Sequence, residues 1–178
     1  VMVMGTSSCH MLNSLANQLV PGVAGVVQDG IVPGFYGYET GQAAVGDAFE
    51  WVRRLLGGDF KKLSDEAAKL PPGSDSVRCV DWFNGCRTPL MDGSLTGSFR
   101  GLTLNHRVEH LYRALLEASA CGVRWIVELL RDGGVPVRKF VATGGLPHHN
   151  PLVVQVYADV LGESITVHPS KQGPALGA

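Results

Sequence analysis

The residues Ala142-Thr143-Gly144-Gly145-Leu146-Pro147-His148-His149-Asn150-Pro151 decide the fold. Residues 137–142, which lead into this stretch, predict a strand, and Thr143-Gly144-Gly145 predicts a tight turn. Residues 151–161 predict a helix, because Asn150 can cap the free N–H groups and proline suits the first helical position. A strand at 164–167 and the first turn of a helix at 175–178 complete an α/β pattern with parallel pairing.

The longest periodic segment lies upstream of this turn. Apolar residues recur every three or four positions over residues 108–130, which predicts a helix of about 25 residues. Gly133-Gly134 ends it. A second apolar stripe makes the hydrophobic arc wide, so the helix is expected to pack on more than one side.

The first half of the chain is rich in glycine and predicts strands. Residues 1–4 run into the turn Gly5-Thr6-Ser7-Ser8, and short apolar runs follow, which predicts a β-meander. The spacing then changes and predicts a helix at 41–56 and a second, short helix at 63–70. Residues 71–105 are rich in turn formers, with one strand predicted at 77–83.

Composition excludes several classes of protein. The 178 residues fit one domain, and 45% apolar residues with a formal charge of −1 exclude a disordered chain and disfavour a nucleic-acid binder. No apolar run approaches the roughly 20 residues that span a bilayer, and no signal peptide is recognisable. Four scattered cysteines without zinc spacing fit reduced thiols. We expect a cytoplasmic protein with no membrane partner.

Charged residues make up only 17% of the chain, against about 25% in typical domains. Interface cores are depleted of charge, so part of the surface is expected to face another domain or a second copy in a homo-oligomer. The sequence starts inside an expected strand and stops inside an expected helix. This predicts that the chain is a piece of a longer protein.

Two glycine turns are candidate phosphate sites. At Gly144-Gly145 the missing side chains would let a flat ligand or a phosphate lie close to the backbone, although a tight turn alone explains the pattern. At Gly5-Thr6-Ser7-Ser8 the hydroxyls can donate to phosphate oxygens, and a hairpin turn is the alternative. Neither turn matches a Walker loop or a dinucleotide fingerprint.

Other candidates remain open. Glu39, in the aromatic stretch 35–41, is either an acceptor for sugar hydroxyls or a solvated carboxylate. A thiolate nucleophile at Cys9 is disfavoured, because its neighbour His10 points to the opposite face of a strand. The pairs His106/His110 and His148/His149 lack a third ligand and favour surface histidines over a metal site. Asp81-Trp82-Phe83-Asn84-Gly85 is either catalytic or a turn.

Taken together and in order, four segments resemble the C-terminal half of the FGGY carbohydrate kinases, and within that family the bacterial L-ribulokinases. They are residues 4–11, residues 20–22 with 34–42, residues 81–87, and a last set made of 142–145, 150–151, 155, 158–160 and 174–178. The last set is similar to the adenosine-binding motif of the superfamily. The resemblance implies an actin-like ATPase fold of two ribonuclease-H-like domains with ATP and sugar between them. Residues 1–178 would form the second domain, a mixed sheet flanked by helices.

The resemblance also implies the roles of individual residues. The positions matching the ATP site are Gly5, Thr6, Gly46, Glu50, Gly144, Gly145 and Asn150. Thr6 would contact phosphate, Gly46 and Glu50 would line the adenosine side, and Gly145 with Asn150 would cover the nucleotide. Glu50 departs from the glutamine of the glycerol kinases. Glu39, with Cys9 nearby, would hold ribulose hydroxyls, and Mg²⁺ would accompany the ATP.

The implied function is that of an ATP-dependent ribulokinase, which makes L-ribulose 5-phosphate in arabinose catabolism. The general base of these kinases is an aspartate upstream of the Gly5-Thr6 strand, so this chain would hold no catalytic residue and is expected to be inactive alone. The segment from Trp51 to Asp81 is also shorter than its counterpart in the ribulokinases that the chain resembles. The alternatives are a kinase for D-ribulose, xylulose or glycerol, or a non-catalytic nucleotide-binding module. A thiol enzyme using Cys9 is a distant third.

Overall fold

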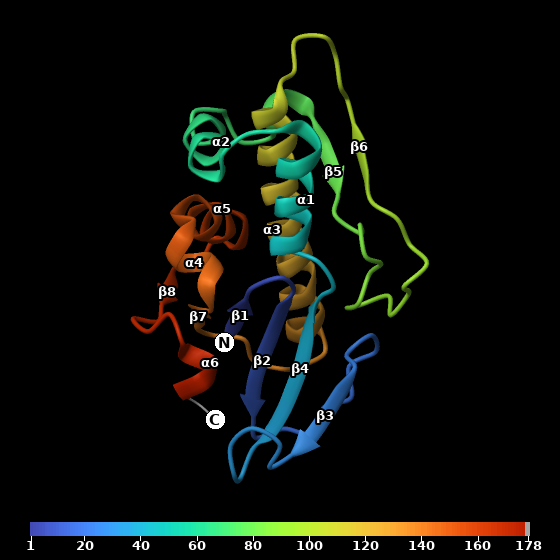
Figure 1. The fold of residues 1–178 in the computed structure, drawn as a ribbon. Coiled ribbons are helices and arrows are strands. Elements are labelled where there is room, and N and C mark those ends of the chain that lie inside the picture. Colours follow the sequence, from blue (N-terminus) through green and yellow to red (C-terminus); the bar gives the residue numbers. More distant parts are fainter. Residues whose placement is uncertain (177–178) are drawn as a thin grey trace.

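The computed structural model describes residues 1–176, and the helical turn expected at 175–178 therefore lies partly outside the described residues (Figure 1). The strands are β1 (Met2–Met4), β2 (Ser8–Ser14), β3 (Gly25–Gln28), β4 (Tyr36–Gln42), β5 (Arg78–Val80), β6 (Ser98–Arg100), β7 (Phe140–Thr143) and β8 (Ile165–Val167). The helices are α1 (Gly46–Leu56), α2 (Phe60–Ala67), the 3₁₀ turn η1 (Ser74–Ser76), α3 (Val108–Asp132), α4 (Gly145–His149), α5 (Pro151–Leu161) and α6 (Gly173–Leu176).

Six strands form one mixed sheet in the order β3-β4-β2-β1-β7-β8. The pairs β1–β2, β2–β4 and β3–β4 are antiparallel, as in a meander. The predicted meander is nevertheless wrong in its strand order, because β4 lies between β2 and β3. The pairs β1–β7 and β7–β8 are parallel, which confirms the pairing predicted for the second half. The sheet is therefore mixed and flanked by helices, as expected.

The long helix α3 is the centre of the core. It packs against α1, α2 and α5, and Figure 1 shows these helices gathered around it. Tyr112, Leu115, Leu116 and Val123 are fully buried on it. Its contacts with α1, α2, α5 and the strands β4 and β5 confirm the packing on more than one side predicted from the wide arc, although Trp125 remains exposed. Its bounds and those of α5 agree with the sequence prediction.

The helix predicted at 41–56 begins five residues later, at Gly46. Residues up to Gln42 belong to β4, which the sequence analysis missed, because they pair with β2 from Ser8↔Gln42 to Ser14↔Tyr36. The helix predicted at 63–70 is α2 and starts earlier, because Asp59 caps it. The Asp59 carboxylate accepts hydrogen bonds from the backbone N–H groups of Lys61 and Lys62, at 2.9 and 3.1 Å.

Other bounds also differ from those predicted. Strand β5 ends at Val80 rather than residue 83, β7 starts at Phe140 rather than residue 137, and β6 and α4 were not predicted. The cap expected from Asn150 is wrong, since its side chain makes no capping bond to α5. The side-chain amide donates instead to the hydroxyl of Tyr112, at 2.7 Å.

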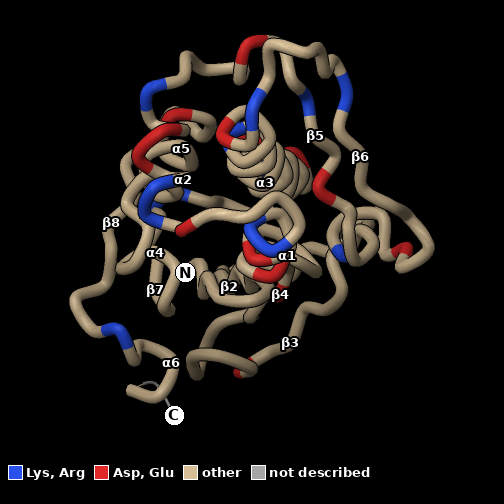
Figure 2. Tube along the Cα trace, turned by 45° about the horizontal axis from the view of Figure 1, so that its top comes forward, with Lys and Arg blue, Asp and Glu red and all other residues tan. Residues whose placement is uncertain are grey.

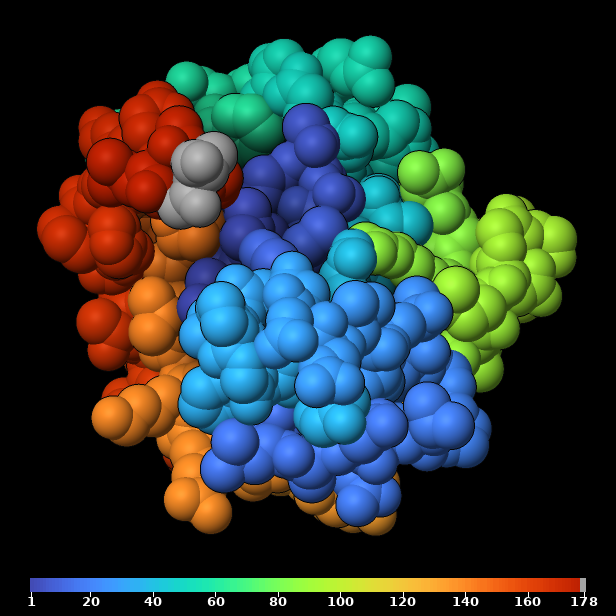
Figure 3. Space-filling view, turned by 90° about the horizontal axis from the view of Figure 1, so that it is seen from below, coloured from blue at the N-terminus to red at the C-terminus, as the bar shows by residue number. Residues whose placement is uncertain are grey.

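Charge and hydrophobicity are unevenly distributed over the surface. Figure 2 shows most acidic and basic residues on the helices and on the segment around β5 and β6, with few along the six-stranded sheet. Residues 15–35 cover the centre of the face in Figure 3 and carry exposed apolar side chains, namely Leu15, Leu19, Val27, Ile31 and Val32. The expectation that some of the surface faces another domain or subunit stays a prediction. Among residues 1–176 no helix is long and apolar enough to cross a bilayer.

Three backbone segments meet where β1 ends. The carbonyl of Thr6 accepts hydrogen bonds from the N–H groups of Val45 and Asp47, at 2.9 and 3.2 Å, and the carbonyl of Gly5 accepts one from Gly46, at 3.0 Å. A Cβ on Gly46 would lie 2.5 Å from the Gly5 oxygen, and a Cβ on Gly144 would lie 2.5 Å from the carbonyl oxygen of Met4. Only glycine permits these approaches.

Replacing Gly46 by alanine should therefore destabilise the fold. The added methyl group meets backbone, which cannot rotate away, so we expect Gly46→Ala to lower the free energy of unfolding by about 1–3 kcal/mol. Denaturant unfolding measures this. Gly25→Ala is the control, because a Cβ at that position has nothing within 4 Å. Equal stability of the two variants would contradict the close approach.

Candidate functional site

A cavity of about 1200 Å³ opens between the turn after β1, the helices α1 and α2, and the segment from α4 into α5. Six of the seven residues that the sequence analysis assigned to ATP line it, namely Gly5, Thr6, Gly46, Glu50, Gly145 and Asn150. The seventh, Gly144, directly precedes α4 and has a left-handed backbone (φ +96°). Residues scattered over the chain thus meet in one place.

The turn Gly5-Thr6 forms one end of the cavity. Its carbonyl groups are tied to the start of α1 by the hydrogen bonds described above, so the turn is fixed in place. The Thr6 side chain is exposed, and no hydrogen bond within residues 1–176 engages its hydroxyl. This hydroxyl is therefore free to donate to a ligand oxygen.

Asn150 presents an unpaired acceptor at the other side. The residue is buried, and its amide nitrogen donates a hydrogen bond to the hydroxyl of Tyr112. Its amide oxygen is buried without a hydrogen-bond partner within the described residues. Burying an unpaired acceptor costs about 1–3 kcal/mol, which a donor group placed within reach of this oxygen would recover. Burial raises the pKa of Tyr112, which keeps its phenol protonated.

Glu50 lies on the cavity wall, but its carboxylate is occupied. Arg53 donates to both carboxylate oxygens, at 2.7 Å each, and this bond lowers the pKa of Glu50. The guanidinium of Arg53 also lies 5.6 Å from the ring centre of Phe60. A direct contact of Glu50 with a nucleotide stays a prediction.

Sequence reasoning missed Phe60 and Tyr112, which both line the cavity. Aromatic side chains at a cavity wall offer flat apolar surface to a ring. Tyr112 lies on an apolar stripe of the long helix, where its polar hydroxyl was the available signal in the sequence. Phe60 preceded the predicted start of its helix and carried no signal.

A second cluster lies on β2 and β4. The register pairs Cys9 with Gly41 and Met11 with Glu39, so Cys9 and Glu39 occupy one face of the sheet. Between them lies Arg87, which pairs with the Glu39 carboxylate and donates to the Cys9 sulfur, at 3.5 Å. The two residues predicted to bind sugar are thus brought together. No pattern in the sequence indicated a role for Arg87.

His10, which follows Cys9 in the sequence, makes its contacts within the fold and not with Cys9. His10 lies on the opposite face of β2, as expected, and its Nε2 is 2.7 Å from the Ser8 hydroxyl. Burial, aided by positive charges that include Arg87, lowers the pKa of His10 to about 3. His10 is therefore neutral and faces away from Cys9.

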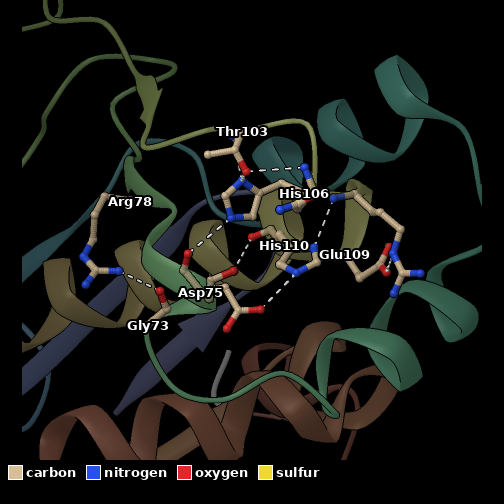
Figure 4. A network of polar contacts seen from close by, with 10 residues as sticks. Gly73, Asp75, Arg78, Thr103, His106, Glu109 and His110 are labelled. Atoms are coloured by element: carbon tan, nitrogen blue, oxygen red, sulfur yellow. Dashed lines mark hydrogen bonds and ion pairs between the residues drawn. The ribbon is translucent and has the colours of Figure 1, made fainter.

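His106, just before α3, and His110, on α3, connect this helix to the turn η1 (Figure 4). His110 Nε2 lies 3.2 Å from the carboxylate of Asp75, and His106 Nε2 lies 3.2 Å from the backbone oxygen of the same residue. Thr103 donates its backbone N–H to His106 Nδ1, at 2.8 Å. Within the described residues no group of three or more His, Cys, Asp or Glu side chains can hold a metal ion.

The segment that starts at Asp81 contains a turn, with the N–H of Gly85 bonded to the carbonyl of Trp82. Burial raises the pKa of Asp81 to about 6, against the opposing effect of a hydrogen bond from Gln42. Asp81 does not line the cavity described above. The predicted turn is confirmed, and a catalytic role of the segment stays a prediction. The Gln42 amide that donates to the Asp81 carboxylate also donates to the Ser119 carbonyl on α3.

A family model described as the FGGY family of carbohydrate kinases, C-terminal domain, matches residues 1–178. The chain is 47% identical to a ribulokinase of Shouchella clausii and 43% identical to a ribulokinase of Bacillus licheniformis. Both alignments cover the full length of this chain. These alignments cover 34% and 35% of the two proteins. The chain thus spans about a third of the length of the curated relatives it matches.

Solved structures have the same fold. The xylulose kinase from Rhodospirillum rubrum matches 99% of this chain and 36% of its own with a TM-score of 0.88 and 30% identity. The glycerol kinase from Plasmodium falciparum, solved with ADP, matches 99% of this chain and 36% of its own with a TM-score of 0.81 and 25% identity. The predicted actin-like ATPase fold is confirmed. The chain therefore belongs to the FGGY family of carbohydrate kinases, whose C-terminal domain it matches throughout.

Proposed function

We propose that this chain is the nucleotide-side domain of an ATP-dependent ribulokinase, which converts L-ribulose and ATP to L-ribulose 5-phosphate and ADP. The observation that carries the proposal is the single cavity lined by six of the seven residues assigned to ATP. The ADP named for the glycerol kinase neighbour supports a nucleotide there. The ribulokinase relatives support the sugar. The pathway proposed is arabinose catabolism.

The cavity residues divide the work of holding ATP. Thr6, at the fixed turn, donates its hydroxyl to a phosphate oxygen, because hydrogen bonds to charged oxygens are the stronger class. The adenosine lies between α2 and the start of α5, where Phe60 offers apolar surface. The unpaired oxygen of Asn150 accepts a hydrogen bond from the nucleoside. Binding thus satisfies a buried acceptor that the protein leaves open.

The sugar end involves Glu39 and a second domain. Glu39 accepts hydrogen bonds from ribulose hydroxyls, with Cys9 beside it. An upstream N-terminal domain supplies the aspartate that takes the proton from the terminal hydroxyl. The sugar oxygen then bonds to the γ-phosphorus as the bond to the bridging oxygen breaks, and ADP leaves. Since phosphoryl transfer depends on positioning, this chain alone is inactive.

Mg²⁺ belongs to the proposal as a companion of ATP. It usually keeps several waters and is held by substrate phosphates with one or two carboxylates. Asp47 lies on the cavity wall in the first turn of α1, and its backbone N–H donates to the Thr6 carbonyl, at 3.2 Å. The cytoplasm is the proposed compartment, because all four cysteines are free thiols.

Loss of the Thr6 hydroxyl should weaken the use of ATP. In the complete enzyme we expect Thr6→Val to lower kcat/KM for ATP roughly 10- to 100-fold, with the KM for sugar unchanged. Steady-state kinetics with each substrate varied in turn measure this. Thr96→Val is the matched control, since Thr96 is exposed and lies outside the cavity. Unchanged kinetics in Thr6→Val would remove Thr6 from the nucleotide site.

The choice of sugar is tested by a substrate panel. ADP release is measured with L-ribulose, D-ribulose, xylulose and glycerol, on this chain and on a chain extended upstream. We expect turnover in the extended chain alone, fastest with L-ribulose. Faster turnover with xylulose, the substrate named for the Rhodospirillum rubrum neighbour, would replace the sugar and keep the kinase. No turnover with any of the four would favour a non-catalytic nucleotide-binding module.

A further inference from the structure

Within residues 1–176, Arg87 is the one side chain that bonds to both residues assigned to the sugar. One terminal nitrogen pairs with Glu39 Oε1, and the other donates to the Cys9 sulfur, at 3.5 Å. The Glu39 side chain is 55% exposed and that of Arg87 is 30% exposed. An ion pair this exposed contributes little to the free energy of folding. The ion pair instead restricts the orientation of the Glu39 side chain, because an unpaired glutamate in solvent samples several rotamers.

The backbone holds Arg87 firmly over the strands. Its neighbour Thr88 is buried and exchanges two hydrogen bonds with Gly41 on β4: the Thr88 N–H donates to the Gly41 carbonyl, and the Gly41 N–H donates to the Thr88 hydroxyl, each at 3.2 Å. On the other side, Cys86 and Asp92 exchange two backbone bonds of 2.9 Å each and close the loop. The base of the Arg87 side chain is therefore anchored on both sides.

Gly41 makes room for the guanidinium. A Cβ at this position would lie 3.1 Å from the Arg87 nitrogen that faces Cys9, and 2.2 Å from the carbonyl oxygen of Ser8. Strand β4 therefore has no side chain at the point where the guanidinium crosses it. The planar guanidinium of Arg87, held over Gly41, gives the Glu39 carboxylate one preferred orientation.

We propose that Arg87 is a positioning residue, which holds the Glu39 carboxylate in the orientation that receives the sugar. Arg87 occupies Oε1, while no hydrogen bond within residues 1–176 engages Oε2, so Oε2 is left to accept from a sugar hydroxyl. The inference rests on the proposed role of Glu39. Lysine does not substitute fully, since its single nitrogen replaces the two guanidinium nitrogens that separately reach Cys9 and Glu39 in a fixed plane.

A double-mutant cycle in the complete enzyme tests this, with the sugar that gives the fastest turnover. We expect Arg87→Met to raise the KM for sugar roughly tenfold through misplacement of Glu39, and to leave the KM for ATP unchanged. Glu39→Ala should raise the KM for sugar at least as much. Because Arg87 acts through Glu39, Arg87→Met added to Glu39→Ala should change the KM less than about twofold.

Two further variants keep the test decisive. Arg100→Met is the matched control, an exposed arginine on β6 that makes no ion pair within residues 1–176, and we expect unchanged kinetics. Arg87→Lys keeps the charge should Arg87→Met fail to fold, and we expect an intermediate KM for sugar. Thermal unfolding of each variant separates loss of fold from loss of positioning.

The outcomes are distinguishable. An unchanged KM for sugar in Arg87→Met, a wild-type KM in Arg87→Lys, or effects of Arg87→Met and Glu39→Ala that multiply in the double variant would each overturn the positioning role and leave the proposed function standing. Unchanged sugar kinetics in Glu39→Ala would overturn both the positioning role and the proposed sugar contact. Nucleotide kinetics of the same variants report on the ATP site independently.

Discussion

The close approach of three backbone segments at the end of β1 determines where everything else lies. The Gly5-Thr6 turn is hydrogen-bonded to the first turn of α1, and Gly144 passes against Met4. These segments are far apart in the chain, and glycine at each crossing allows backbone to meet backbone. Helices α1 and α4 start from this meeting point, and α2 and the start of α5 complete the cavity wall. The residues assigned to ATP are largely those that form the crossing itself.

Two acid–arginine pairs in the molecule differ in kind. Glu50 and Arg53 are three apart on α1, a local pair that occupies the carboxylate fully and marks the cavity rim. Glu39 and Arg87 are 48 residues apart and meet only because Thr88 docks on Gly41. The first pair limits what Glu50 can offer to a ligand. The second leaves one carboxylate oxygen open, so the two acids cannot have equivalent roles.

The sequence predicted best those elements whose bounds are set locally. Helices α3 and α5 follow from periodicity and stop signals, and the gathering of the ATP residues follows from motifs that the family resemblance placed. Pairing decided the rest: Gly41 and Gln42 continue a strand because β2 lies beside them, although the apolar spacing favoured a helix. Asn150 has good capping chemistry, yet Tyr112 binds its amide. The place of Arg87 depends on a docked loop, which no local pattern encodes.

The central claim is that the cavity at the end of β1 binds nucleotide. Hydrogen–deuterium exchange of this chain with and without saturating ADP tests it most directly, because exchange protection reports which backbone segments a ligand covers. The account predicts protection at residues 5–6, 46–50, 60–65 and 145–152, with the loop at 90–97 unchanged. Protection confined to other segments, or none under saturating ADP, would contradict the assignment of this cavity.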